Sequence, residues 1–397
     1  MSAADVTVVI PARNAAATIG RAVASVRGER VHEIVLVDHA CGDDTVAVAQ
    51  RHAPCALRTV PADASLRLGG VRQRGVDAVT TPLAIWLDAD DEFLDGRVDR
   101  LAARLDAGAD LVADAAEVET IDGTRRVVPI PAFVQQPGGW VRLFERNYLP
   151  APGVIGFRTE VLRRVGYDPT QHGPEDTDIL LRALDAGASL ACEPTPGYRI
   201  HALPTSLSRD MRNQRAMYRA LLLKHAPAHV QALYLANGWS ERVALWAVHT
   251  IALFTNDLPA AASHLDAIAA LVDDVTDDEI VEPDGPQPYA EGWRLAFARG
   301  TLALLTGNDG LALEVLTDAE RRRPSAEGAN NLGMALVRHG RSSDAAACFA
   351  TAVARRPDYV DAQANLADRP PTRVTTHPFR AHDNRLDYVL PTATVQA

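Results

Sequence analysis

Lysine is almost absent from this sequence. Of the 40 basic residues 39 are arginine, and Lys224 is the single lysine. P-loop NTPases need a lysine after their glycines, kinases need one on a strand, and PLP enzymes need one for the Schiff base. Lys224 stands in LLLKHAP, which fits none of these settings. The composition therefore argues against all three classes of enzyme.

Cysteine motifs and long apolar runs are also missing. The four cysteines, Cys41, Cys55, Cys192 and Cys348, are scattered without CxxC spacing, so zinc ligation and a disulfide framework are both poor interpretations. The most apolar helical stretch, VALWAVHTIALF, is too short to span a bilayer. The first residues lack the basic start and apolar run of a secretory signal. We therefore expect reduced thiols, no membrane span and a cytoplasmic location.

Positive charge is in deficit. With 40 basic and 51 acidic residues the net charge is −11, which argues against nucleic acid or an anionic membrane as the main partner. The 397 residues are 47% apolar, which is ordinary for globular proteins, and the length predicts two or three domains.

Strand-like and helix-like segments alternate over residues 1–115. The runs VTVVIP, EIVLVD, ALRTV and PLAIWLD read as buried strands, and amphipathic segments stand between them. Such alternation predicts parallel strands with crossover helices, hence an open α/β sheet. Ligands of these sheets bind at the carboxyl ends of the strands, so we expect the chemistry there.

The rest of the chain is predicted to be mainly helical beyond about residue 211. Gly300, Gly307, Ala312 and Pro324 recur 33 residues later as Gly333, Gly340, Ala345 and Pro357, within one residue of the tetratricopeptide period. Two such units are few for an independent solenoid, so we expect docking on helical neighbours or a homodimer. We predict a catalytic α/β domain over 1–212, a helical connector with an acidic linker over 213–288, tetratricopeptide-like repeats over 289–368, and an extended or disordered tail over 369–397.

An acidic cluster, LDADD at 87–91, follows an apolar strand directly. Asp88 and Asp90 are two residues apart, so they point to the same side of an extended chain. Two carboxylates at a strand end suit a hard divalent cation that is shared with phosphate oxygens. They also suit the capping of the following helix, DRLAARLDAG. Taken alone, the cluster does not decide between these interpretations.

Four motifs in one order and at close spacing decide it. VVIPARN, EIVLVDHACGDDT, VRQRG and LDADDE together resemble the nucleotide-binding half of a GT-A glycosyltransferase of family 2, the large family of inverting enzymes. The resemblance covers roughly residues 5–210. It implies a GT-A fold, a Rossmann-like open mixed sheet, and a nucleotide-sugar donor.

The resemblance also implies roles for individual residues. Asp38 would accept a hydrogen bond from a uracil-type base, and Asp88 would contact the ribose. Asp90 would bind Mg²⁺ or Mn²⁺ bridging the diphosphate. The remaining donor-side residues would line the base and ribose or face the nucleotide: Pro11, Ala12, Arg13 and Arg72. A solvated helix arginine is the competing interpretation of Arg72.

Two later segments extend the resemblance to the acceptor side. In GPEDTDILLRAL, Asp176 would be the general base and Glu175 would orient it or touch the acceptor, whereas the competing interpretation is a capping cluster of acids. In YRIHALPTSLSR, His201 would be the second metal contact, although a lone histidine is usually structural. The loop from Ser206 to Arg209 would close over the diphosphate.

The chemistry implied by these roles is coherent. A metal and arginine neutralise the departing nucleoside diphosphate without a lysine. An aspartate near its reference pKa of about 3.9 is a weak base for a hydroxyl, so it must act late, whereas a thiol acceptor would need less help. The chain departs from the family pattern at His39 and Cys41, which replace an Asp and a Ser or Thr. Asp38 is retained, but the base preference becomes uncertain.

We therefore expect a metal-dependent, inverting transfer of one sugar from a UDP-linked donor. The acceptor is a peptide or protein, or a natural-product or cell-envelope glycan. The alternative is a catalytically inactive GT-A scaffold whose repeats bind protein partners, with His39 as its main support. A processive polysaccharide synthase and a nucleotidyltransferase are disfavoured, because the signature of the first and the Gly-rich loop of the second are missing.

Overall fold

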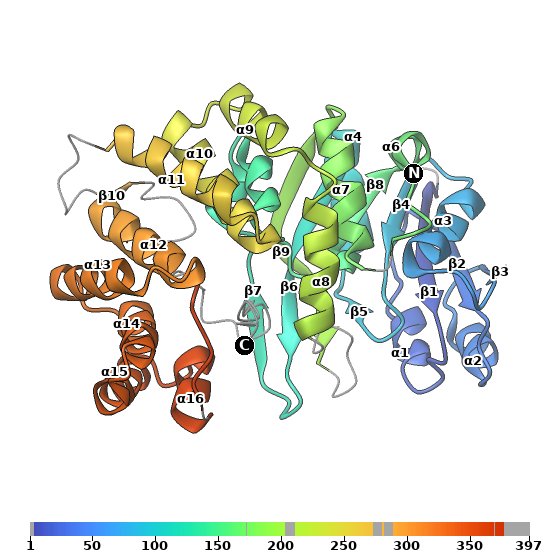
Figure 1. Cartoon of the computed structure of the whole chain (residues 1–397). Helices are drawn as coiled ribbons and strands as arrows, with labels where there is room; N and C mark the ends of the chain where they lie inside the picture. Colours follow the sequence, from blue (N-terminus) through green and yellow to red (C-terminus); the bar gives the residue numbers. More distant parts are fainter. Residues whose placement is uncertain are drawn as a thin grey trace. The chain divides into compact units, whose positions relative to one another are not determined.

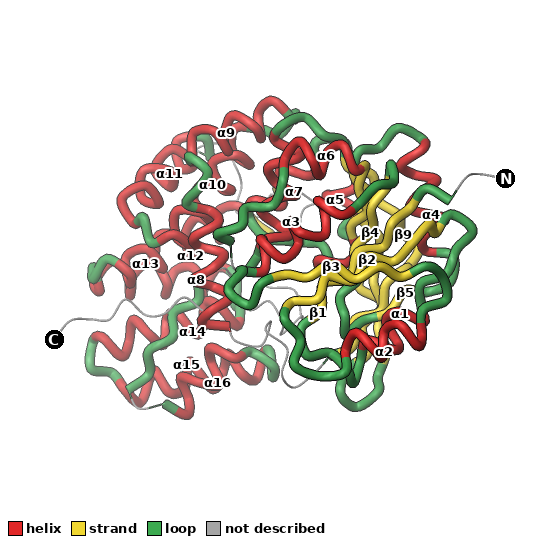
Figure 2. The backbone as a smooth tube through the Cα atoms, turned by 90° about the vertical axis from the view of Figure 1, so that its right-hand side faces the viewer, coloured by secondary structure: helices red, strands yellow, loops and turns green. Residues whose placement is uncertain are grey.

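The computed structural model describes residues 4–171, 173–202, 211–272, 280–281, 289–368 and 370–376. The chain divides into two compact units, residues 1–221 and 222–397. A mixed sheet with surrounding helices forms the first unit, and helices dominate the second (Figures 1 and 2). The α/β domain followed by a helical region is confirmed, with one short β-ribbon in the second unit that the all-α prediction lacks.

The first part of the sheet is parallel. Its elements follow in the predicted order: β1 (Val6–Ala12), α1 (Ile19–Ala24), β2 (Val31–His39), α2 (Thr45–His52), β3 (Leu57–Ala62), α3 (Leu68–Ala78) and β4 (Leu83–Trp86). The strands lie side by side in the order β3-β2-β1-β4. The chain adds β2 and β3 on one side of β1 and then returns to add β4 on the other side. Right-handed crossovers then place α3 on the face opposite α1 and α2 (Figure 2).

The second part of the sheet is mixed, which the sequence pattern does not reveal in detail. β8 is antiparallel to both β4 and β6, and β9 is parallel to β6 and antiparallel to β5. β7 is antiparallel to β6. These elements are β5 (Glu92–Phe93), α4 (Arg97–Asp106), β6 (Leu111–Glu119), β7 (Arg125–Val128), α5 (Ala132–Gln135), η1 (Gly139–Phe144), η2 (Pro152–Val154), β8 (Ile155–Arg158), α6 (Thr159–Val165), α7 (Glu175–Asp185) and β9 (Leu190–His201).

Close packing between the parallel strands and α3 depends on one glycine. The β-branched run of β1 is fully buried, with Val8, Val9 and Ile10 at 0% exposure. A Cβ atom on Gly75 of α3 would lie 2.6 Å from Cγ1 of Val9 and 3.2 Å from the ring of Trp86. Only glycine lets α3 approach the sheet this closely, and the approach fixes the position of the other α3 residues.

The second unit consists of helix pairs. The helix α8 (Met211–Leu222) precedes it. The elements of the unit are α9 (Pro227–Ala236), α10 (Glu241–Thr255), α11 (Leu258–Ala270), β10 (Ile280–Val281), β11 (Tyr289–Ala290), α12 (Glu291–Leu305), α13 (Asp309–Arg322), α14 (Ala326–Arg338), α15 (Ser342–Arg355) and α16 (Val360–Ala367). Among the described residues, none of the helices combines the length and the apolar character that a bilayer crossing requires.

The boundary between the units differs from the predicted domain boundary at 212/213. The division falls after Leu221, near the end of α8. Tyr218 of α8 is buried, and its hydroxyl donates a hydrogen bond of 3.1 Å to the carbonyl oxygen of Leu143. α8 is therefore packed as part of the first unit, a tertiary contact that helical periodicity does not report.

The predicted connector and the predicted repeats share one core. Leu245, Trp246 and Leu265 of α10 and α11 pack in one apolar cluster with Leu295 and Leu302 of α12. They form a single compact unit rather than two domains. Of the acidic linker at 273–288, only 280 and 281 belong to the described residues, and they pair with 289 and 290 in a short antiparallel ribbon.

The 33-residue repeat corresponds to two helix pairs, α12 with α13 and α14 with α15. A Cβ on Gly300 would meet Cγ of Leu316 at 2.5 Å, and a Cβ on Gly333 would meet Cε1 of Phe349 at 2.6 Å. Both contacts recur at the same spacing, so each pair uses one glycine for close approach. Their assignment to the tetratricopeptide class stays a prediction.

Part of the predicted tail belongs to the described chain. Residues 370–376 have no regular secondary structure, but Val374, Thr375 and Thr376 are buried. For the tail as a whole, 369–397, the extended or disordered state stays a prediction. Arg369 and residues 377–397 lie outside the described residues.

Candidate active site

The loops that follow β1 and β2 are joined at the carboxyl edge of the sheet. Ala12 is paired in register with Asp38. An Asp38 carboxylate oxygen accepts a hydrogen bond of 2.9 Å from the main-chain N–H of Cys41, and the Cys41 thiol donates to the carbonyl oxygen of Ala12 at 3.4 Å. Pro11, Ala12 and Asp38 thus come together as predicted, while Arg13 is exposed beside them. Cys41 acts here as a link between the two loops.

His39 occupies the position that departs from the family pattern. Its side chain is 8% exposed, and it ends β2 in register with Ala62 of β3. Burial, together with the nearby charge of Arg13, lowers the pKa of His39, so the ring is neutral at pH 7. The substitution therefore adds no charge to the loop that carries Asp38.

The acidic cluster forms where the chain leaves β4. Burial raises the pKa of Asp90, and the charge of Asp88 raises it further. Burial and both neighbouring carboxylates raise the pKa of Asp91 well above its usual range. Three carboxyl groups therefore repel one another in a poorly solvated place, and a bound cation would relieve that repulsion.

Strand β9 holds this cluster in place. The hydroxyl of Tyr198 accepts a hydrogen bond of 3.1 Å from the main-chain N–H of Asp88, and an Asp91 carboxylate oxygen accepts one of 2.8 Å from the N–H of His201. Sequence reasoning did not select Tyr198 or Asp91. No local signal selects them, because Tyr198 and His201 are an odd number of residues apart in a strand, and both bonds join residues 110 positions apart.

The His201 ring lies between two glutamates. Its Nε2 is 3.6 Å from Oε1 of Glu92, and its Nδ1 is 3.6 Å from Oε1 of Glu119. Burial is the main cause that lowers the pKa of His201, which leaves a neutral ring. Neither glutamate was selected from the sequence. The main-chain bond to Asp91 ties His201 to the acidic cluster, but its role as a partner of Asp90 on a metal stays a prediction.

A metal fits this place by its chemistry. No group of three or more His, Cys, Asp or Glu side chains within the described ranges is arranged to hold an ion by itself. Asp90 and its carboxylate neighbours are nevertheless the oxygen ligands that Mg²⁺ prefers, and such sites take their other ligands from substrate phosphates and water. The residues present thus fit a cation that is shared with a phosphorylated ligand.

Arg72 is the buried centre of the site. It is 3% exposed, so it is not a solvated helix arginine. Its Nη2 donates to Oδ1 of Asp88 at 3.1 Å, and its Nε donates to Oε1 of Glu175 at 2.7 Å. The guanidinium also lies 5.2 Å from the centre of the Trp86 ring. Arg72 therefore connects the donor-side carboxylate to the acceptor-side helix, and a direct contact with the nucleotide stays a prediction.

Helix α7 buries its first acidic turn. Glu175 is 3% and Asp176 is 8% exposed, whereas capping acids normally stay in water. Burial, with the neighbouring charge of Glu175, raises the pKa of Asp176 to about 7. The sequence-based expectation that this carboxyl keeps a pKa near 3.9 is wrong, because it neglects the desolvation that the fold imposes.

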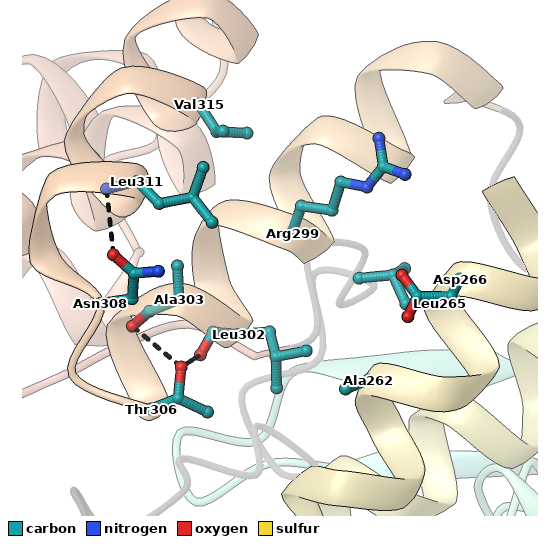
Figure 3. Close-up of a pocket in the computed structure, with 10 residues that line it drawn as sticks. All are labelled: Ala262, Leu265, Asp266, Arg299, Leu302, Ala303, Thr306, Asn308, Leu311 and Val315. Atoms are coloured by element: carbon teal, nitrogen blue, oxygen red, sulfur yellow. Dashed lines mark hydrogen bonds between the residues drawn. The ribbon is translucent and has the colours of Figure 1, made fainter.

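Two other parts of the chain bear on the chemistry, a predicted loop and a pocket. Arg209 and the loop from Ser206 lie outside the described residues. A pocket in the second unit, between α11, α12 and α13, is lined mostly by apolar side chains with one acid, Asp266, and one arginine, Arg299 (Figure 3). It lacks paired carboxylates, so the edge of the sheet is the better candidate for catalysis.

Known proteins resemble large parts of this chain. Residues 7–166 match the family model described as Glycosyl transferase family 2. The succinoglycan biosynthesis protein ExoO of Rhizobium meliloti is 30% identical over 232 residues, which are 52% of this chain and 64% of ExoO. The uncharacterized glycosyltransferase Mb0553 of Mycobacterium bovis is 34% identical over 200 residues, which are 47% of this chain and 82% of that protein. A crystal structure of S. aureus TarS 1-349 with UDP-GlcNAc covers 90% of this chain and 93% of TarS 1-349, with a TM-score of 0.48 and 13% identity.

The family model and the sheet topology define the class of the first unit. It is a Rossmann-like mixed sheet of the GT-A type with its acids at the carboxyl edge. The chain belongs to glycosyltransferase family 2. It spans just under two thirds of the length of ExoO.

Proposed function

We propose that this protein transfers one sugar from a nucleotide-diphospho-sugar, UDP-linked, to an acceptor with inversion at the anomeric carbon. Asp176 is the general base and Asp90 holds the divalent metal, with His201 as its second protein contact. The acceptor is a peptide or protein, or a natural-product or cell-envelope glycan. The name of ExoO, a succinoglycan biosynthesis protein, supports a glycan acceptor for that relative.

The observation that carries the proposal is the bridge made by Arg72. Asp88 and Glu175 are far apart in the sequence, yet one buried guanidinium hydrogen-bonds to both. A nucleotide-sugar whose ribose lies at Asp88 would therefore place the anomeric carbon of its sugar close to α7. Asp176 lies in the same first turn of α7 as Glu175. The bridge supports a single site in which donor and acceptor meet.

The environment of Asp176 supports its role as the base. A general base works best when its pKa is close to the working pH. The pKa of Asp176, raised to about 7, is closer to neutral pH than that of an ordinary aspartate. Asp176 takes the proton of the acceptor hydroxyl or thiol as that atom bonds to the anomeric carbon, and the bond to the nucleoside diphosphate breaks. A divalent metal bound at Asp90 would supply neutralisation of the departing charge.

The donor-side loops would hold the nucleotide. Asp38 accepts from the base, and Pro11, Ala12 and Arg13 line the base and ribose. Arg209 closes over the diphosphate. The helical repeats, tetratricopeptide-like in their 33-residue period, serve partner binding or homodimerisation, and the protein works in the cytoplasm.

The test measures release of UDP and free sugar from a panel of UDP-sugars with Mn²⁺ by NMR. We expect Asp176→Asn to lower kcat by about 10²–10⁴-fold with little change in the donor KM. Asp185→Asn, the same exchange at the other end of α7, is the matched control and should retain the rate. Removal of the metal with EDTA should stop the reaction, and added Mn²⁺ should restore it.

The scaffold alternative makes the opposite prediction. An inactive GT-A domain shows no turnover with any donor and no metal-dependent binding of UDP in calorimetry. Turnover that is unchanged in Asp176→Asn would contradict the role of the base, while UDP binding that requires Mn²⁺ would still support the donor site.

A further inference from the structure

The segment 371–376 lies against α14 and α16 of the second unit, which contact each other (Figure 1). Four polar side chains hydrogen-bond to it, Asn330 and Asn331 of α14 and Asp361 and Asn365 of α16. All four side chains are buried, at 0 to 1% exposure. We call these four residues the asparagine groove.

Two asparagines hold the main chain of the segment. Asn331 donates to the carbonyl oxygen of Thr375 at 2.8 Å and accepts from the N–H of the same residue at 2.8 Å. Asn365 does the same to Arg373, donating to its carbonyl oxygen at 2.8 Å and accepting from its N–H at 2.9 Å. Each carboxamide thus imitates a neighbouring strand, and the two positions are two residues apart, as an extended chain requires.

Two side chains of the segment, those of Val374 and Thr375, make specific contacts with the groove. The Thr375 hydroxyl donates to Oδ2 of Asp361 at 2.9 Å and accepts from Asn330 at 3.3 Å. Val374 packs into the apolar core of the helix pairs. A segment that binds here therefore needs a β-branched apolar residue followed by a residue with a hydroxyl. Its other contacts with the groove are hydrogen bonds of the main chain.

The segment leaves one hydrogen-bond acceptor of the groove without a donor. The other carboxylate oxygen of Asp361, Oδ1, is buried without a hydrogen-bond partner among the described residues. A buried carboxylate oxygen without a donor is unfavourable. A segment that brings a further N–H or O–H to this position would bind better than the one now present.

The polar lining also suits exchange. The four polar side chains of this groove would regain water as their partner when the segment leaves, while the part of the apolar cluster that Val374 covers would become exposed.

We propose that the asparagine groove is a binding site for an extended segment of a partner protein, with a β-branched residue followed by Thr or Ser. Residues 371–376 occupy the site in cis and compete with that partner. This inference concerns the second unit alone and does not depend on the proposed transfer reaction. The short connection from α16 gives the cis segment an effective concentration of about 1 mM, so a partner binds the intact chain with reduced apparent affinity.

The test uses the full chain and a fluorescein-labelled peptide, PPTRVTT, which has the sequence of residues 370–376. Thr375→Pro removes the N–H that Asn331 accepts and the hydroxyl that Asp361 accepts, so it weakens the cis segment. We expect this variant to bind the peptide about tenfold more tightly than the wild-type chain in fluorescence anisotropy. Adding Asn331→Ala to Thr375→Pro should abolish the gain, whereas adding Asn237→Ala, outside the groove, should not.

A second measurement keeps the proposal testable if Thr375→Pro fails to fold. An excess of unlabelled peptide, about 1 mM, should displace the cis segment of the wild-type chain and speed hydrogen exchange at the amide of Thr375. Peptide binding that is insensitive to Asn331→Ala overturns the proposal. So does unchanged exchange together with no gain in the folded Thr375→Pro variant, which would make residues 371–376 a permanent part of the fold.

Discussion

At the scale of single residues, the carboxyl group of Asp176 lies in an environment that favours its neutral form. It is buried at the start of α7 beside Glu175, and the guanidinium of Arg72 opposes the effect only in part. Its pKa is therefore raised to about 7. A base with this pKa is half ionised near neutrality, so small changes of pH alter the fraction of active enzyme.

The first prediction concerns the pH dependence of the reaction. Only ionised Asp176 can accept a proton, so we expect kcat/KM for the release of sugar to rise about tenfold per pH unit below pH 7 and to level off above it. The measurement is a pH profile at saturating Mn²⁺. A profile that is flat between pH 5 and 8 would contradict the assignment of Asp176 as the base.

The same shift has a consequence for stability that needs no substrate. The folded protein holds the proton of Asp176 more tightly than the unfolded chain does, so this group's contribution to stability falls as the pH rises from about 4 to about 7. Asn cannot ionise. We therefore expect Asp176→Asn to have a higher Tm than the wild type at pH 8, with the difference shrinking at pH 5.

Residue types were predictable from the sequence where they belong to a local motif, and their partners were not. Asp88, Asp90, Glu175 and Asp176 could be selected because each stands at a strand end or a helix start. The pairing of Arg72 with Glu175 joins residues 103 positions apart, and no spacing rule reports such a contact. The raised pKa of Asp176 depends on burial, which is likewise a property of the tertiary structure.

At the scale of elements, the helix pairs α12–α13 and α14–α15 each depend on a glycine at the point of contact. A Cβ on Gly333 would lie 2.6 Å from Phe349, inside the contact distance that real side chains show. We predict that Gly333→Ala lowers the stability of the second unit by about 1–3 kcal/mol through overpacking. The measurement is thermal or urea unfolding followed by circular dichroism.

Gly310 provides the matched control for that substitution. It lies in α13 of the same unit, and a Cβ there would have no heavy atom within 4 Å. Gly310→Ala should therefore leave the packing unchanged and raise stability by about 0.4–1 kcal/mol through the lower entropy of the unfolded chain. Equal changes in stability for the two substitutions would show that helix propensity, and not the contact with Phe349, determines the effect of Gly333→Ala.

The elements themselves could be predicted to different degrees along the chain. The parallel strands β1 to β4 fall on the short strand-like runs that stand between helical segments in the sequence, and the predicted order is confirmed. Beyond Leu111 the strands β6, β8 and β9 pair across long stretches of chain, partly antiparallel, so their order depends on tertiary packing. The placement of α8 with the first unit was missed for the same reason, since its contact with Leu143 is not local.

At the scale of the whole molecule, the two proposed activities belong to different units. The residues of the candidate active site that the structure describes fall within residues 1–221, and the asparagine groove falls within residues 222–397. The helical unit has apolar clusters of its own. Two units with separate cores can carry two independent activities.

This division leads to a prediction about combined variants. We expect Asp176→Asn to abolish sugar release without changing the affinity for the peptide PPTRVTT, measured in the Thr375→Pro background. We expect Asn331→Ala to do the reverse and to leave donor hydrolysis within about twofold, because sites that share no partner residues act additively. The double variant should show both losses, each equal to that of the single variant within about 0.5 kcal/mol. A loss of donor hydrolysis in Asn331→Ala, with the fold intact by circular dichroism, would instead mean that occupation of the groove controls the sugar-transfer site.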